Sequence, residues 1–289
     1  MTQQVTDAPV AEPIVSAGPA AAPKLTRVLA IANQKGGVGK TTTAINLGTA
    51  LAANGEQVLI VDLDPQGNAS TGLGIDRGSR RHSTYDVLIG DAKLRDAILP
   101  TAVPRLSIAA STMDLSGLEL QIAQERDRAY RLRNALTALD HVPAAGVAYS
   151  YVLVDCPPSL NLVTVNAMAA ANAILVPLQC EFFALEGLSQ LLKTVEQVKA
   201  TLNPELTIHG IVLPMYDARN NLAGQVVADV RQFMGEKVYE TVIPRNVRVS
   251  EAPSYGKPVL LYDLKCLGSQ AYLRLASEII QREKSLRAA

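Results

Sequence analysis

The stretch NQKGGVGKTTT, residues 33–43, carries residue types that bind phosphate. It follows the apolar run Val28–Ala32 and leads into a helical pattern that begins at Thr41. A glycine-rich turn between a strand and a helix directs backbone N–H groups and the helix N-terminus toward phosphate oxygens. We expect Lys40 to contact the β- and γ-phosphates of a nucleotide and the hydroxyl of Thr41 to join a Mg²⁺ shell. The other loop residues expected at the phosphates are Gly36, Gly37, Val38, Gly39 and Thr42.

This loop departs from the usual phosphate-binding pattern in two ways. The pattern GxxxxGK[ST] begins with a glycine, but that position is Gln34 here. A second lysine, Lys35, stands beside it, on the far side of the glycines from Lys40. The loop therefore has the end of a Walker A motif without its beginning, and Lys35 needs a role of its own.

Aspartates follow two further apolar runs. VLIVDLDPQGN contains Asp62 and Asp64, and YVLVDCPPS contains Asp155. In an open parallel sheet, ligands bind at the carboxyl ends of the strands. We therefore expect Asp155 to hold Mg²⁺ through water and Asp64 to orient or activate an attacking water, with a water-mediated metal contact as its second candidate role. Two roles remain open for Asp62: supporting the metal's ligands from behind, or capping a turn.

The elements that must position these residues follow an alternating order. Short apolar, β-branched runs alternate with helical patterns, which predicts an α/β fold with a mainly parallel, twisted sheet and helices on both faces. Gly55 is expected to end the first helix. The predicted helices include Thr41–Ala53, Leu118–Leu139, Leu185–Leu202 and Gln225–Met234. The predicted strands are Val28–Ala32, Val58–Leu63, Leu106–Ala109, Tyr151–Val154, Ala173–Leu178, Ile208–Leu213 and Val238–Ile243.

Composition bounds the remaining possibilities. The 289 residues are 48% hydrophobic and carry no net formal charge. Residues 1–24 are rich in Ala and Pro, which predicts a flexible tail before a single domain at 25–289 and argues against a secretory signal. No stretch approaches the roughly 18 unbroken apolar residues of a membrane span, so we expect a soluble protein. The last helical pattern, from Ser269 to about Arg287, is expected to pack against the sheet rather than lie on a membrane surface.

The cysteines and histidines do not indicate a metal site. Cys156, Cys180 and Cys266 form no CxxC pair and have no nearby histidine, which is typical of free thiols in a reducing cytoplasm. The three histidines are scattered along the chain, and we interpret each as structural or solvated.

Five motifs together resemble the ParA/Soj family of bacterial chromosome-partitioning ATPases. They occur in the family's order from about Val28 to the C-terminal helix, and they are KGGVGKTTT, DLDPQGN, DCPPS, PLQCEFFALEG and VIPRNVRVSEAPSYGKP. The resemblance implies the deviant Walker A form of the P-loop NTPase fold, ATP and Mg²⁺ as cofactors, and an ATP-sandwich homodimer. It implies catalytic roles for Lys35, Lys40 and Asp64 in slow, partner-stimulated hydrolysis of ATP to ADP and phosphate. In such a dimer Lys35 reaches the partner's nucleotide, much as an arginine finger does.

The resemblance also implies contacts beyond the phosphates. A nucleobase site is expected near Pro244, Arg245 and Asn246. The dimer is expected to bind double-stranded DNA without sequence preference, and a ParB-type centromere-binding protein is expected to stimulate hydrolysis. The protein is thus expected in the cytoplasm, on the nucleoid.

For DNA, Arg219 and Arg248 match the family's DNA-contacting arginines, and Lys257 and Lys265 are weaker candidates. From Lys237 to the end, nine Lys and Arg stand against five Asp and Glu. Such a local excess is sufficient for non-specific contacts to phosphates.

Four rival functions share parts of this pattern. A MinD-like membrane ATPase needs a basic, strongly apolar terminal helix, which this sequence lacks. A nitrogenase iron protein-like reductase needs two cysteines per subunit at a shared cluster, a weak match to Cys156 and Cys180. A plasmid-type partition ATPase that represses its own operon carries an N-terminal DNA-reading domain, for which 24 residues are too few. A binding module without hydrolysis would be separated by a phosphate-release assay.

Overall fold

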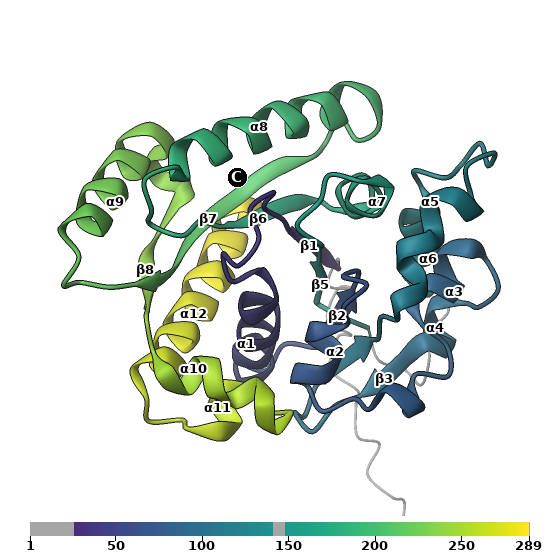
Figure 1. The fold of residues 1–289 in the computed structure, drawn as a ribbon, viewed down its shortest axis with the longest axis horizontal. Coiled ribbons are helices and arrows are strands. Elements are labelled where there is room, and N and C mark those ends of the chain that lie inside the picture. Colours follow the sequence, from purple (N-terminus) through teal and green to yellow (C-terminus); the bar gives the residue numbers. More distant parts are fainter. Residues whose placement is uncertain (1–25, 141–147, 289) are drawn as a thin grey trace, which may run out of the picture.

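In the computed structural model, which describes residues 26–140 and 148–288, eight strands form one sheet (Figure 1). Their order across the sheet is β3-β4-β2-β5-β1-β6-β7-β8. Every neighbouring pair is parallel except β3 with β4, which confirms the predicted mainly parallel sheet. The strands are β1 (Arg27–Ile31), β2 (Val58–Asp62), β3 (Ile98–Pro100), β4 (Leu106–Ala109), β5 (Tyr151–Asp155), β6 (Ala173–Pro177), β7 (Thr207–Tyr216) and β8 (Val238–Pro244).

Helices connect these strands and cover the sheet. The longer ones are α1 (Lys40–Ala53), α6 (Arg131–Asp140), α7 (Leu162–Ala170), α8 (Ala184–Thr201), α9 (Asn221–Met234) and α12 (Leu267–Ala288). The shorter ones are α2 (Asn68–Gly72), α3 (Thr84–Ile89), α4 (Leu94–Ala97), α5 (Leu118–Gln121), α10 (Val247–Glu251) and α11 (Val259–Tyr262).

Each face of the sheet buries a separate core. Successive strand side chains point to opposite faces, so Leu29 and Ile31 of β1 pack with α1 and α12, while Val28 and Ala30 pack with the core that contains α6, α7 and α8. In Figure 1, α1 (purple) and α12 (yellow) lie side by side. Helices on both faces are what continuously apolar strands require, and that prediction is confirmed.

The C-terminal helix packs on the sheet, as expected. Tyr272, Leu275, Ala276 and Ile279 of α12 are fully buried. They belong to the same core as α1, so the apolar stripe of this helix faces protein. Within residues 26–140 and 148–288, no helix is both long enough and apolar enough to cross a membrane.

The predicted long helix Leu118–Leu139 is wrong. The chain forms α5, turns through residues 122–130, and begins α6 only at Arg131. Asn166 of α7 stabilises the break: its amide nitrogen donates to Arg128 O (2.7 Å) and its oxygen accepts from Leu132 N (3.2 Å). The side chain thus satisfies backbone groups that a continuous helix would have bonded internally.

One prediction is not tested by the structure, and one strand was missed. The predicted tail, residues 1–24, lies outside the described residues, so the division into a tail and one domain stays a prediction. The antiparallel edge strand β3 was not predicted, because its three residues are too few to establish a periodicity.

Candidate phosphate-binding site at the carboxyl edge of the sheet

The glycine-rich loop connects β1 to α1, as the sequence predicts. Gly39 adopts a left-handed backbone (φ 86°), which glycine adopts without strain. It lies beside Pro214 of β7, since a Cβ at Gly39 would be in ordinary contact with the Pro214 ring at 3.5 Å. Asn33 fixes the start of the loop: its amide nitrogen donates to Pro177 O (2.8 Å), and its oxygen accepts from Lys35 N (3.0 Å). Asn33 opens the stretch 33–43 but was not among the residues predicted to bind phosphate.

The two lysines of the loop face different surroundings. Lys40 is buried, and its Nζ donates to Lys35 O (3.0 Å). Burial lowers the pKa of Lys40, and the nearby charges of Asp155 and Asp64 oppose that shift. The ammonium group of Lys35 instead contacts the carboxylate of Glu181, and the two side chains are 44% and 47% exposed. Lys40 therefore points into the site, and Lys35 points toward the surface.

Asp155 ends β5 in register with Ile31, the last residue of β1 before the loop, and is fully buried. Burial raises the pKa of Asp155 well above its usual range, and the adjacent Asp62 raises it further, while the hydroxyl of Thr41 and the charge of Lys40 act in the opposite direction. No described group completes a hydrogen bond to either carboxylate oxygen. A buried carboxylate that lacks partners, beside a threonine hydroxyl, suits the shell of a hard cation such as Mg²⁺.

Asp62 and Asp64 separate into two roles. Asp62 is buried and accepts hydrogen bonds from Ser70 N (2.9 Å), Ser70 Oγ (2.7 Å) and Asp64 N (3.1 Å), so it caps the following loop. Burial raises the pKa of Asp62 to about 6, although these hydrogen bonds lower it. Asp64 is half-buried, and Ser111 Oγ donates to its carbonyl oxygen (2.6 Å). Its carboxylate accepts from Gln66 N (2.9 Å) and retains the capacity to bind water.

The expected nucleobase residues lie on a neighbouring strand end. Pro244 pairs in register with Tyr216 of β7, and Arg245 N donates to Tyr216 O (2.9 Å). Asn246 caps α10, because its side-chain oxygen accepts from Arg248 N (2.9 Å). Pro214 of β7 lies beside Gly39 of the phosphate-binding loop, and β8 is the next strand after β7, so the loop after β8 leaves the same edge of the sheet one strand further along.

The two arginines expected at DNA lie outside the cluster of Lys40 and Asp155. Arg219 follows β7, and its exposed guanidinium pairs with Asp217 (2.7 Å). Arg248 lies on α10, after β8, and pairs with Glu251 (3.0 Å) and more loosely with Asp263 (3.7 Å). Because β7 and β8 are neighbours, both arginines leave the carboxyl edge of the sheet from adjacent strands.

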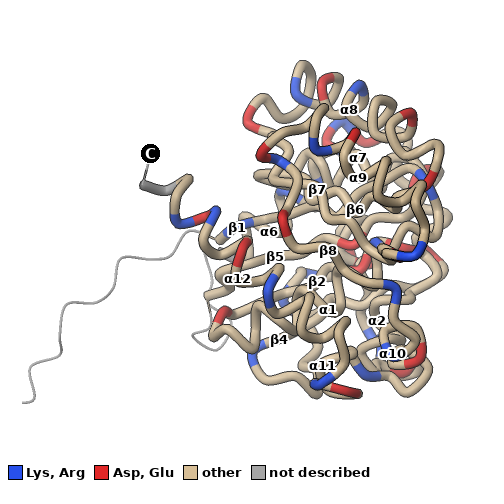
Figure 2. The backbone as a smooth tube through the Cα atoms, turned by 90° about the vertical axis from the view of Figure 1, so that its left-hand side faces the viewer, with Lys and Arg blue, Asp and Glu red and all other residues tan. Residues whose placement is uncertain are grey.

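The two lysines expected at DNA are exposed near the same end of the chain. Lys257 precedes α11 and Lys265 precedes α12, and neither forms an ion pair with any residue of the described segments. In Figure 2, Lys and Arg positions (blue) mix with Asp and Glu positions (red), and blue segments occur around α10 and α11. The excess of Lys and Arg near α10 and α11 is therefore local, because acidic residues elsewhere balance it to a net charge of zero.

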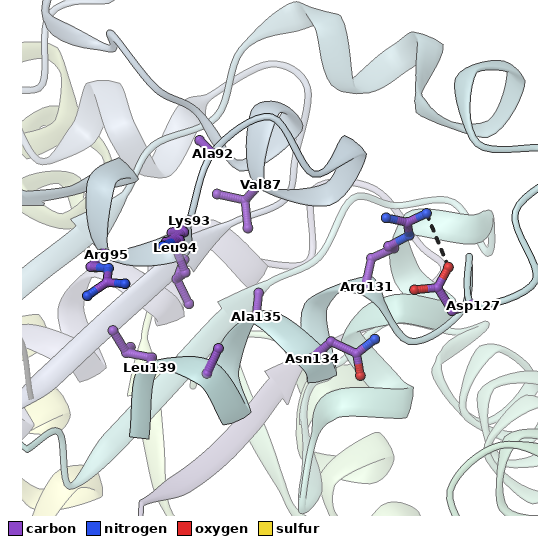
Figure 3. Close-up of a pocket in the computed structure, with 11 residues that line it drawn as sticks. Val87, Ala92, Lys93, Leu94, Arg95, Asp127, Arg131, Asn134, Ala135 and Leu139 are labelled. Atoms are coloured by element: carbon purple, nitrogen blue, oxygen red, sulfur yellow. Dashed lines mark ion pairs between the residues drawn. The ribbon is translucent and has the colours of Figure 1, made fainter. Parts of the chain in front are cut away.

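A separate hollow of about 540 Å³ lies between α3, α4 and α6 (Figure 3). Its apolar wall includes Val87, Leu94 and Leu139, and Arg131 at its edge turns toward Asp127 (3.1 Å). None of the predicted site residues lines it. The hollow lies on the core that contains α6, on the other face of the sheet from α1.

Comparison with known proteins agrees with this geometry. Residues 26–208 match the protein family described as an AAA domain. The chain is 64% identical to the chromosome partitioning protein ParA of Caulobacter vibrioides (91% of this chain, 97% of that protein). It is 49% identical to the sporulation initiation inhibitor protein Soj of Bacillus subtilis (88% and 98%). A solved structure named cobyrinic acid a,c-diamide synthase from Mycobacterium smegmatis, with bound ATP analogue and magnesium, is 36% identical with a TM-score of 0.79 (90% and 96%). This chain belongs to the ParA/Soj family of chromosome-partitioning proteins.

Proposed function

We propose that this protein hydrolyses ATP and that ATP switches it between a monomer and a DNA-binding dimer. The observation that carries the proposal is the separation of the two loop lysines. Lys40 is buried toward Asp155, whereas the ammonium group of Lys35 lies at the surface on Glu181. A nucleotide held by Lys40 thus leaves Lys35 available to a second subunit.

Within one subunit, the loop binds the phosphates. Backbone N–H groups of residues 36–41 and the N-terminus of α1 surround them, and Lys40 neutralises their charge. Thr41 and Asp155, the latter through water, hold Mg²⁺, which neutralises charge on the phosphate oxygens. Asp64 orients the attacking water and accepts its proton. Pro244, Arg245 and Asn246 form the edge at which the nucleobase lies.

The catalytic site is complete only in the homodimer. Two ATP-bound faces repel each other, and Lys35 from each subunit offsets that repulsion by contacting the partner's phosphates. The same charge stabilises the negative charge that develops during phosphoryl transfer. Hydrolysis removes this link between the subunits, so it opens the dimer.

Opening and closing control DNA binding. Each closed dimer carries two copies of Arg219 and Arg248, with Lys257 and Lys265 as additional contacts, and two linked patches bind DNA far better than one. A ParB-type partner that accelerates slow hydrolysis where the chromosome origin lies clears the protein from DNA there. The proposed location is therefore the cytoplasm, on the nucleoid.

Three other functions fit less well. A MinD-like membrane ATPase would need an apolar helix face free for lipid, but the apolar stripe of α12 is buried. A reductase would need thiolate ligands, but burial raises the pKa of Cys156 strongly and that of Cys180 to about 11. The 64% identity to a partitioning protein, against 36% to the synthase structure, favours partitioning.

The test is ATPase activity with and without DNA and a ParB-type partner, measured by phosphate release. We expect slow hydrolysis alone and faster hydrolysis with both additions. Light scattering with a non-hydrolysable ATP analogue is expected to report a dimer. A protein that binds ATP but releases no phosphate under any of these conditions would contradict the proposal.

A further inference from the structure

A basic turn lies beside the expected DNA surface. Residues 76–82, here called the Arg77 turn, connect α2 to α3 and include a short 3₁₀ helix, Arg77–Ser79. The turn carries three arginines and one aspartate, Asp76. No role was predicted for this turn from the sequence.

One arginine of the turn is an anchor. Arg80 is buried, and its guanidinium donates to Ser111 O, Thr71 Oγ1 and Ile75 O, each at 2.9 Å. Ser111 is also the residue that donates to the carbonyl oxygen of Asp64. The turn is therefore fastened to the loop that follows β2, and its two exposed arginines, Arg77 and Arg81, project from a fixed base.

The residues that lead into the Arg77 turn are in backbone contact with the segment that precedes α11. Gly74 and Gly256 both have left-handed backbones, and a Cβ on Gly74 would lie 2.9 Å from Gly256 O. Arg77 and Tyr255 line one hollow of about 480 Å³ at this contact. Lys257 follows Gly256 directly. The Arg77 turn is thus continuous with the Lys257 end of the surface expected to bind DNA.

The exposed basic residues at this contact are free to pair with an external anion. Arg77, Arg81 and Lys257 form no ion pair with any residue in the described parts of the chain. Arg219 and Arg248, by contrast, already pair with Asp217 and with Glu251. Phosphates must displace carboxylates from those two arginines, but not from the Arg77 turn.

We propose that the Arg77 turn is part of the DNA-binding surface, and that Arg77 and Arg81 contact duplex phosphates beside Lys257. This inference rests on the proposed function, in which the ATP-bound dimer binds DNA. Duplex DNA is the favoured partner because the turn continues an existing basic surface and offers charge without an apolar anchor. Each phosphate contact releases counterions, so its loss is visible in the salt dependence of binding.

The experiment measures binding of the ATP-bound full chain to random-sequence duplex DNA between about 50 and 200 mM salt. Arg77→Ala removes one contact per subunit, so the slope of log affinity against log salt is expected to fall by about 2 per dimer. Arg77→Ala/Arg81→Ala is expected to lower it further, and Arg77→Lys to keep it. Asp76→Asn removes the neighbouring negative charge and is expected to strengthen binding.

Arg95→Ala is the matched control, since Arg95 is an exposed arginine on α4, on the other face of the sheet. It is expected to leave the salt slope unchanged. An unchanged salt slope in both Arg77→Ala and the double variant overturns the inference. Loss of stimulation by the ParB-type partner with DNA binding intact also overturns it, because the turn would then bind the partner protein. If Arg77→Ala fails to dimerise, DNA binding by Asp76→Asn decides: stronger binding supports the inference, and unchanged binding contradicts it. Absence of DNA binding by the unmodified protein would instead contradict the proposed function.

Discussion

Lys35 of the phosphate-binding loop contacts Glu181, which lies 146 residues further along the chain, just before α8. We propose that Lys35 acts on the partner's nucleotide, but this contact holds it within its own subunit. Dimer formation must therefore replace the Glu181 carboxylate with phosphate oxygens. Both side chains are about half exposed, so the ion pair contributes only about 0.2–1 kcal/mol, a weak restraint that ATP can overcome.

Removing this restraint is expected to favour the dimer. Glu181→Gln keeps the size of the side chain but loses its charge. Each dimer breaks two such ion pairs, about 2 kcal/mol at most, so dimerisation with ATP is expected at up to about thirtyfold lower protein concentration. Light scattering over a concentration series measures it. Glu196→Gln, an exposed acid further along α8, is the control and is expected to change nothing. Weaker dimerisation of Glu181→Gln would mean that Glu181 itself contacts the partner.

Alanine substitutions of the two loop lysines are expected to cause different defects. Lys35→Ala is expected to bind ATP through Lys40 but not to dimerise or hydrolyse it, because only the contact across the dimer is lost. Lys40→Ala is expected to lose much of the phosphate binding itself. Titration with a fluorescent ATP analogue and light scattering separate the two defects. A normal ATP-dependent dimer of Lys35→Ala would refute the role in trans.

Loss of Asp64 is expected to stop hydrolysis and leave assembly intact. Asp64→Ala removes the carboxylate that orients water, while Asp62 still caps the loop through Ser70. The variant is expected to accumulate as an ATP dimer bound to DNA, with phosphate release lowered by about 10²-fold or more. Phosphate release and DNA retention report the two properties. Normal turnover would transfer the catalytic role to another residue, with Asp62 tested next.

Arg219 and Arg248 are expected to be necessary for DNA binding only. Arg219→Ala or Arg248→Ala is expected to abolish binding at physiological salt, because each loss occurs twice in the dimer. ATP binding and dimerisation are expected to survive, since neither arginine contacts Lys40 or Asp155. Gel shift with unrelated DNA sequences measures binding. Tight binding of DNA by the nucleotide-free monomer would show that the switch works differently.

A buried histidine is expected to make stability depend on pH. His209 lies between Tyr239 and Glu283, and its Nε2 is 2.6 Å from the Glu283 carboxylate. Burial lowers the pKa of His209 below 6.5, although Glu283 opposes this, so the folded protein keeps the ring neutral. As pH falls below about 6.5, the unfolded chain takes up a proton that the folded chain does not, and stability is lost.

The measurement is thermal unfolding between pH 7.5 and 5.5. His209→Asn is expected to be less stable at every pH, because it disrupts the buried hydrogen bonds, but to lose less stability on acidification than the unmodified protein. His82→Asn, which changes an exposed histidine, is the control and is expected to keep the original dependence. Parallel pH curves for His209→Asn and the unmodified protein would contradict the assignment.

The sequence by itself determined the parts of the site that depend on local chemistry. Glycines that allow a left-handed turn, a lysine and threonine that open a helix, and aspartates at the ends of apolar strands are all recognisable within a few residues. The apolar strands also predicted the parallel sheet, whose carboxyl edge then had to bring Lys40, Asp64 and Asp155 together. For the same reason, most predicted strand boundaries agree with the structure to within two residues.

Only the tertiary structure decided the features that depend on distant partners. Asn166, 34 residues from Leu132, breaks the expected helix. Ser70 binds the buried carboxylate of Asp62, whereas Ser111 binds the backbone carbonyl of the half-buried Asp64 and leaves its carboxylate to Gln66 N. Glu181 reaches Lys35 across 146 residues, and Gly74 touches Gly256. Local pattern cannot specify such pairs, because packing of the helices on the sheet selects which distant side chains meet.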